Sequence, residues 1–171
     1  DTLNEIDSYI NIGETFRMMN SLDSAEHYMN MALAQSNKLQ TPFTWALAIG
    51  NLGLIHAQKH DYDKALIELN QAITHLDQTN HEAAALVYKS AIGTIYLQLG
   101  QQNKGESLLI DCYNGSVNYG IKESIRDISK QLSLYYESQN QFSKALEYRK
   151  IFETYNDSLR NIENVRAMEQ Q

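Results

Sequence analysis

The chain has 171 residues, of which 43% are hydrophobic and 20% charged, so it can build a folded core and is not a disordered tail. Its formal charge is −7, and it has no cluster of Lys or Arg, so we expect no nucleic acid among its partners. The single cysteine, Cys112, excludes an intrachain disulfide, and no apolar run is long enough to predict a membrane span or membrane contact.

Small residues recur at a fixed spacing along the whole chain. Gly13, Gly53, Gly93 and Ser133 are each 40 residues apart, and a second series with the same step contains Ala25, Ala65, Gly105 and Ala145. Internal self-similarity of this kind is typical of repeat proteins. The sequence therefore predicts four units, at about residues 3–40, 43–80, 82–120 and 122–157, followed by a capping or connector helix over residues 158–171.

Each unit is expected to be a pair of helices, because apolar residues recur at helical spacing on both sides of a central turn. In the first unit the stripe before the turn contains Tyr9, Ile12, Phe16 and Met19. The small residue in each helix lets its partner approach closely, and a larger side chain there would push the two helices apart.

Residues that tolerate left-handed backbone are predicted to end several of these helices. They are Asn20, His60, Gly100, Gly120 and Asn140. Thr41 followed by Pro42 predicts a helix start between the first two units, and Thr79 with Glu82 predicts a capping box that opens the third.

The end of the chain is predicted to be a further helix, capped by Asp157 or Ser158. We expect Leu159 and Ile162 to pack on the fourth unit and the remainder to project as a connector. A homodimer formed through this helix is the alternative to a simple cap, because an apolar edge can also begin a coiled coil.

The repeat resembles the tetratricopeptide repeat (TPR). The second unit carries the resemblance best, with Leu52-Gly53 in its first helix and Tyr62, Ala65-Leu66, Leu69 and Ala72 in its second. The resemblance implies an all-α fold, a right-handed superhelical solenoid of four antiparallel helix pairs plus the C-terminal helix. Units of 40 residues look like those of bacterial regulatory arrays, which bind peptides, proteins or small molecules.

The first helices of such a solenoid line its concave face, so their non-core residues are the candidate ligand-binding residues. These residues are Asp7, Asn11, Glu14, Arg17, Asn51, Leu54, Gln58, Thr94, Gln98, Lys130 and Leu134. Asn11 and Asn51 match the groove asparagine with which peptide-binding TPR proteins hold a peptide backbone. A solvated polar helix face is the alternative, because helix surfaces are usually polar.

The sequence offers no constellation that predicts catalysis. His56 and His60 have the spacing of two zinc ligands on one helix, but the intervening residues lack the glutamate of zinc hydrolases. His56 stands where other units have Phe16, Tyr96 and Tyr136, so we expect it to pack in the core, and we expect Cys112 to be a buried inert thiol. The sequence thus predicts no enzyme, no metal site and no cofactor.

The chain begins without methionine and stops within a helical pattern, so we expect it to be a piece of a longer protein. The resemblance then implies the input region of a bacterial signalling protein, which binds a protein or peptide in its groove. Such a region is periplasmic when the sensor is membrane-bound and cytoplasmic otherwise. A scaffold that joins proteins without signalling is the alternative.

Overall fold

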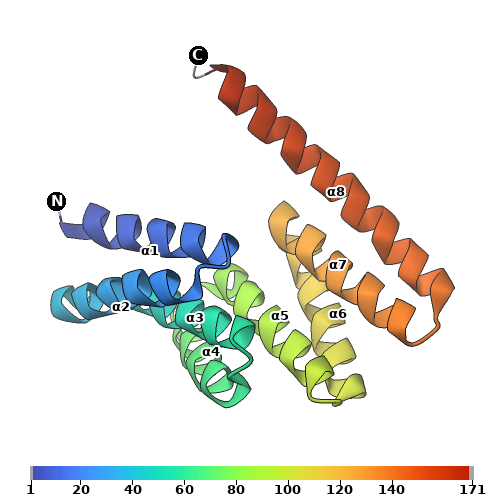
Figure 1. The fold of residues 1–171 in the computed structure, drawn as a ribbon, viewed down its shortest axis with the longest axis horizontal. Helices are drawn as coiled ribbons and strands as arrows, with labels where there is room; N and C mark the ends of the chain where they lie inside the picture. Colours follow the sequence, from blue (N-terminus) through green and yellow to red (C-terminus); the bar gives the residue numbers. More distant parts are fainter. Residues whose placement is uncertain (1, 170–171) are drawn as a thin grey trace. The chain divides into compact units, whose positions relative to one another are not determined.

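The computed structural model describes residues 2–169, and this part of the chain is all-α (Figure 1). Eight helices follow one another as sequential antiparallel pairs, in the TPR-like arrangement that the sequence predicts. They are α1 (Thr2–Met18), α2 (Leu22–Leu39), α3 (Pro42–Gln58), α4 (Tyr62–Gln78), α5 (Glu82–Gln98), α6 (Gln102–Tyr119), α7 (Lys122–Ser138) and α8 (Phe142–Glu169).

The chain forms two compact units, Asp1–Ile95 and Tyr96–Gln171. In the first unit α1 packs on α2, α3 packs on α4, and both α1 and α2 also contact α3. In the second unit α7 packs on both α6 and α8. No helix among the described residues has the length and apolarity needed to cross a membrane.

Every turn between helices has the same backbone geometry. One residue in each turn has positive φ, and these residues are spaced by 20: Asn20, Gln40, His60, Asn80, Gly100, Gly120 and Asn140. The residue after each of them donates its N–H to a carbonyl five residues back, as Ser21 does to Phe16 at 2.9 Å and Gln141 to Tyr136 at 2.9 Å. This is the Schellman motif, which satisfies carbonyls that the helix end would otherwise leave unpaired.

The small residues of the repeat lie where paired helices touch, as predicted. A Cβ built at Gly53 would lie 2.7 Å from Cγ of Leu69, and one at Gly13 would lie 3.3 Å from the carbonyl oxygen of Ala25. Ala25 and Ala65 are fully buried. The 40-residue period therefore marks the close contacts within each helix pair.

Some local predictions are wrong. Thr79 does not open α5; its hydroxyl donates to the carbonyl of His75 at 2.8 Å and so caps the end of α4. The predicted core residues Ile12 and Met19 are exposed.

The last predicted helix is not separate from the fourth unit. α8 runs unbroken for 28 residues, so Asp157 and Ser158 lie inside it and cap nothing. Leu159 is buried and Ile162 is half-buried, as expected for residues that pack on the array, whereas Val165 and Met168 are exposed. The prediction for the helix end at residues 170–171 lies outside the described residues.

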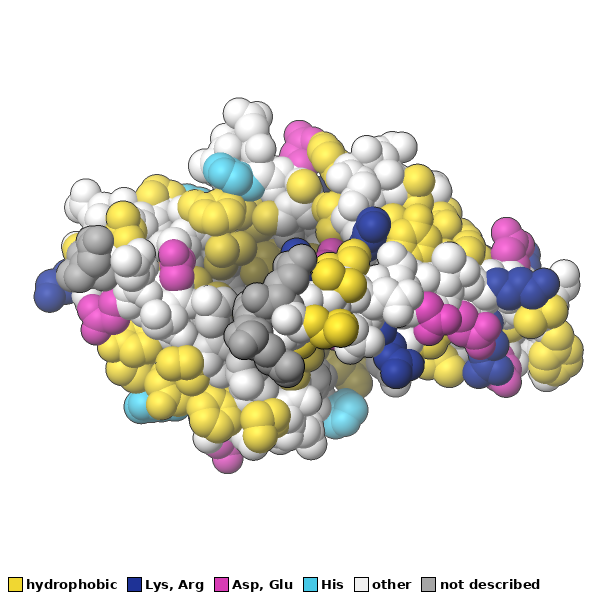
Figure 2. Space-filling model, turned by 90° about the horizontal axis from the view of Figure 1, so that it is seen from above, with side chains coloured by type: hydrophobic (Ala, Val, Ile, Leu, Met, Phe, Trp, Pro, Cys, Tyr) yellow, Lys and Arg dark blue, Asp and Glu magenta, His cyan; other side chains and the backbone are white. Residues whose placement is uncertain are grey.

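Charged side chains on the surface are mixed in sign. On the face that Figure 2 shows, Lys and Arg lie among Asp, Glu and apolar side chains and do not gather into one basic patch.

Candidate functional site

Tyr88 of α5 reaches across to the first helix of the preceding pair. Its side chain is buried, with 3% of the residue exposed, and its hydroxyl donates to the carbonyl of Leu47 on α3 at 3.2 Å. The same hydroxyl lies 3.5 Å from Oδ1 of Asn51. The amide oxygen of Asn51 is thus turned towards α5, and this residue is half-buried.

Two predicted groove residues of α1 act on the same phenol. Arg17 donates from Nε to Oε2 of Glu14 at 2.8 Å, and its Nη2 donates to Oε1 of the same carboxylate. Burial is the main cause that raises the pKa of Tyr88 above its usual range; the Glu14 carboxylate adds to the rise, and the Arg17 guanidinium opposes it. The name Tyr88 cluster is used here for Tyr88, for Asn51 beside its hydroxyl, and for the Glu14–Arg17 ion pair whose charges act on the phenol. These residues lie on the first helices of three successive pairs.

A glycine that the sequence did not single out makes this approach possible. A Cβ built at Gly50 would lie 2.4 Å from Cζ of Tyr88 and 2.6 Å from both Cε atoms. Contacts this short are not tolerated, so only glycine lets the ring come this close to the α3 backbone. The sequence pattern did not reveal this role of Tyr88 in joining α3 and α5.

The other predicted groove residues make fewer contacts. Asp7, Asn11, Gln58, Gln98, Lys130 and Leu134 are exposed, and Leu54 and Thr94 are half-buried. Thr94 donates its hydroxyl to the carbonyl of Ser90 at 3.2 Å, and Nζ of Lys130 lies 5.8 Å from the centre of the Phe152 ring. Gln98, Lys130 and Leu134 belong to the second compact unit.

His56 lies at the centre of a buried polar network that joins α2, α3 and α4. Its Nδ1 is 2.5 Å from Oε2 of Glu68, a carboxylate that is itself buried. Its Nε2 is 2.9 Å from Nζ of Lys64 and 3.3 Å from Oε1 of Glu26. His56 is therefore buried, as predicted, but it acts as a hydrogen-bonding hub rather than an apolar packing residue.

Lys59 forms ion pairs with two carboxylates at the more exposed side of this network. Its ammonium group is 2.6 Å from Oε2 of Glu26 and 2.7 Å from Oδ1 of Asp23. The hydrogen bond from Lys59 is the largest cause that lowers the pKa of Glu26, and the bond to Asp23 is the largest cause that raises the pKa of Lys59. His60, by contrast, is exposed and lies 2.9 Å from the Tyr62 hydroxyl, so the two histidines do not share a site.

A contact equivalent to the one between Glu26 and His56 recurs 80 residues later, in the second compact unit. Glu106 accepts hydrogen bonds from the hydroxyls of Tyr136 at 2.7 Å and Tyr135 at 3.0 Å. Glu106 and Tyr136 stand two repeats after Glu26 and His56. Because the pair recurs at the repeat spacing, we assign it to packing between successive helix pairs rather than to a ligand site.

No protein-family model and no curated protein matches the sequence. Solved structures do match it. One is the crystal structure of aspartyl phosphate phosphatase F from Bacillus subtilis, with 14% sequence identity and a TM-score of 0.60. The match covers 88% of this chain but only 49% of the phosphatase chain, so this chain spans about half the length of that structure. The likeness establishes the TPR-like fold.

Proposed function

We propose that the chain is a non-enzymatic module that binds a protein or peptide, and that it serves as the sensory input region of a bacterial signal-transduction protein. The observation that carries this proposal is the Tyr88 cluster, in which Oδ1 of Asn51 lies 3.5 Å from the Tyr88 hydroxyl and the paired charges of Glu14 and Arg17 act on the same phenol. The resemblance to a fold found in a bacterial phosphatase supports a regulatory setting.

The polar groups of this face suit a peptide backbone. Asn11 on α1 is exposed, and the Asn51 amide keeps its N–H donors available even though its oxygen lies near Tyr88. An amide side chain offers both a donor and an acceptor, which matches the alternating groups of an extended peptide. Glu14 and Arg17 add one charge of each sign on α1.

The proposal is tested by capture with two matched double variants. Asn11→Ala/Asn51→Ala changes the proposed face, whereas Asn30→Ala/Asn70→Ala changes exposed asparagines at the same 40-residue spacing on the second helices α2 and α4. Proteins retained by the wild type are identified by mass spectrometry, and their affinity for all three forms is then measured with purified components.

We expect Asn11→Ala/Asn51→Ala to weaken partner binding and to leave the melting temperature nearly unchanged, because Asn11 is exposed and the Tyr88 hydroxyl keeps its hydrogen bond to the carbonyl of Leu47 when Asn51 is removed. The control variant should bind like the wild type. Equal weakening by both variants would assign the partner to another surface, and unfolding of the first variant would make Asn11 and Asn51 structural residues.

A further inference from the structure

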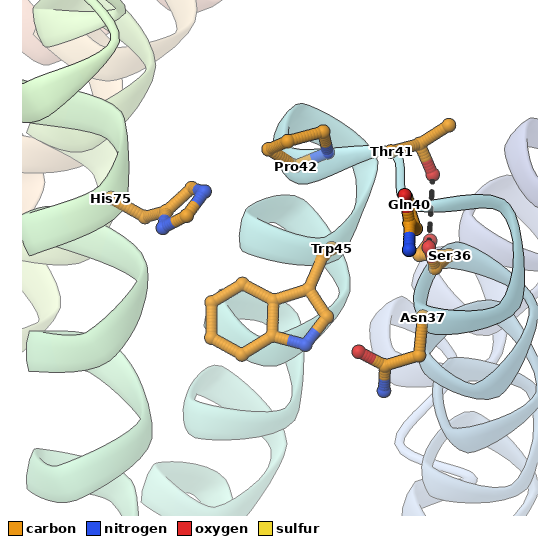
Figure 3. Close-up of a pocket in the computed structure, with 7 residues that line it drawn as sticks. All are labelled: Ser36, Asn37, Gln40, Thr41, Pro42, Trp45 and His75. Carbon is orange, nitrogen blue, oxygen red and sulfur yellow. Dashed lines mark hydrogen bonds between the residues drawn. The ribbon is translucent and has the colours of Figure 1, made fainter.

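A second candidate site lies on the first compact unit, away from the Tyr88 cluster. A pocket of about 330 Å³ opens between the end of α2, the start of α3 and the last turns of α4 (Figure 3). Its volume is at the lower end of the range for small-molecule sites. The pocket shares only α3 with the Tyr88 cluster, so the two sites can be tested separately.

The walls of the pocket are aromatic and apolar on one side. The rings of Trp45 and His75 have their centres 5.3 Å apart at an angle of 58°, and Pro42 lies beside them. In Figure 3 the His75 ring, from α4, and the Asn37 amide, from α2, both point towards the Trp45 indole. A planar ligand ring would therefore meet flat apolar surface in this pocket.

The remaining lining is polar but carries no permanent charge. Among the described residues that line the pocket, none is Asp, Glu, Lys or Arg. The hydroxyl of Ser36 is already used, since it donates to Thr44 at 3.1 Å, whereas the amides of Asn37 and Gln40 are exposed to the pocket side of the surface. This lining favours an uncharged ligand with a hydrogen-bonding group, because a charged one would lose hydration without gaining an ionic partner.

His75 supplies the most specific feature. Its Nε2 is buried and has no hydrogen-bond partner among the described protein atoms. Buried polar atoms are normally paired, and an unpaired one raises the free energy of the folded state. Nε2 is covered by neighbouring atoms, so a ligand reaches it when the imidazole turns about its Cβ–Cγ bond. Trp45 and His75 also line a second hollow of about 360 Å³, together with Ile67 and Thr74.

We propose that this pocket binds a small uncharged phenol. The phenol ring packs on Trp45 and Pro42, and its hydroxyl pairs with Nε2 of His75. A hydroxyl can donate and accept, so it satisfies Nε2 in either tautomer of the imidazole. The amides of Asn37 and Gln40 bind a second polar substituent at the open side of the pocket.

Trp45 makes the proposal directly testable, because it is the one tryptophan in the sequence. Titration of the whole chain with para-fluorophenol is followed by tryptophan fluorescence, and binding is measured in parallel by fluorine NMR. We expect saturable binding that changes the Trp45 signal, with tighter binding of para-fluorophenol than of fluorobenzene. The absence of saturable binding, or equal binding of the two probes, would overturn the proposal.

Two variants test the role of His75. His75→Phe keeps an aromatic ring on Trp45 but removes Nε2, and we expect it to weaken binding roughly three- to tenfold. The same substitution at the exposed residue His27, and the variant Asn11→Ala/Asn51→Ala, should both bind para-fluorophenol like the wild type. Wild-type affinity in His75→Phe would overturn the assignment of Nε2.

The phenol of the natural ligand has two sources, a free molecule or a tyrosine side chain of a peptide. N-acetyltyrosine amide carries the same ring on a piece of backbone and separates them. If N-acetyltyrosine amide binds more tightly than para-fluorophenol, the natural ligand is a tyrosine side chain. If it binds more weakly, the natural ligand is a free phenol. Both results support a phenol site.

Discussion

The phenol ring of Tyr88 occupies the space that a side chain at residue 50 would need, since a Cβ on Gly50 would lie 2.4 Å from Cζ of Tyr88. α5 therefore rests directly on the backbone of α3, and the Tyr88 hydroxyl reaches the carbonyl of Leu47 one turn earlier. This contact fixes where the first helix of the third pair meets the first helix of the second.

We predict that Gly50→Ala destabilises the protein by about 1–3 kcal/mol, because the added methyl group overpacks a rigid ring. The measurement is urea unfolding followed by circular dichroism. Gly13→Ala is the comparison, and we expect it to cost less. Its Cβ would lie 2.9 Å from Cε of Met29, the flexible end of a side chain, and 3.3 Å from the carbonyl oxygen of Ala25, and it gains helix propensity. Equal destabilisation by both variants would contradict the proposed rigidity of the Gly50–Tyr88 contact.

His56→Phe places an aromatic residue where three of the four units have one, yet we predict that it destabilises the protein by about 2–4 kcal/mol. The substitution leaves the buried carboxylate of Glu68 without the imidazole that lies 2.5 Å away. Thermal and urea unfolding measure the change.

The double variant His56→Phe/Glu68→Leu is the matched control, because it removes the orphaned carboxylate as well. We expect its stability to return to within about 1 kcal/mol of the wild type, as is common when a buried polar pair is replaced as a whole. If the double variant is as unstable as His56→Phe, the loss comes from the shape of phenylalanine and not from Glu68.

Acid should weaken the network around Glu26. The pKa of this carboxyl is lowered from its ordinary value of 4.5 in the folded state, chiefly by the hydrogen bond from Lys59. The resulting stabilisation is present above pH 4.5 and is lost as the pH falls through the lower folded-state pKa. We expect Glu26→Gln and Lys59→Met to lose stability less steeply than the wild type below pH 4.5. Identical slopes in all three proteins would show that the pair does not contribute.

We predict that substitution by glycine has opposite effects on the free energy of unfolding at two glutamines in the turns, Gln40 and Gln139. Gln40 has φ 51° and ψ 50°, a left-handed conformation that costs any residue with a Cβ, so Gln40→Gly should raise the free energy of unfolding by roughly 0.5–1 kcal/mol. Gln139 has φ −90°, so Gln139→Gly should lower it by a similar amount through the flexibility of the unfolded chain. Changes of the same sign at both positions would contradict this account.

The helical repeat was predictable because it rests on residues with strong local preferences. Gly13 and Gly53 recur at the repeat spacing and mark the helix contacts, and Asn20, His60 and Asn140 suit left-handed backbone. Gln40 and Asn80 adopt the same conformation but lie outside the positions compared between units, so the left-handed residue was missed in two of the seven turns. α8 was divided wrongly because Asp157 and Ser158 resemble helix caps, while nothing in the sequence reveals that the preceding turn stays helical.

The candidate sites were less predictable because they depend on contacts between helices that are far apart in the sequence. Asn51 and Glu14 could be placed on helix faces, but their proximity to Tyr88 depends on how closely α5 approaches α3. His56 replaces the aromatic residue that the other units have at this position, and Glu68 lies among the inward-facing residues of α4. These two polar residues at inward-facing positions were the signal for the polar network. Trp45 and His75 gave no signal, because neither belongs to the repeat pattern.

The uniform turns have a consequence for how such a chain can be lengthened or recombined. A turn that closes a pair has the same hydrogen bonds as a turn that joins two pairs, so the backbone itself does not mark where a module begins. Exchange of a 20-residue segment between related arrays can start at any of these junctions and still close the chain. Whether the product folds then depends on the side chains alone, above all on the small residues that determine which helices pack closely together.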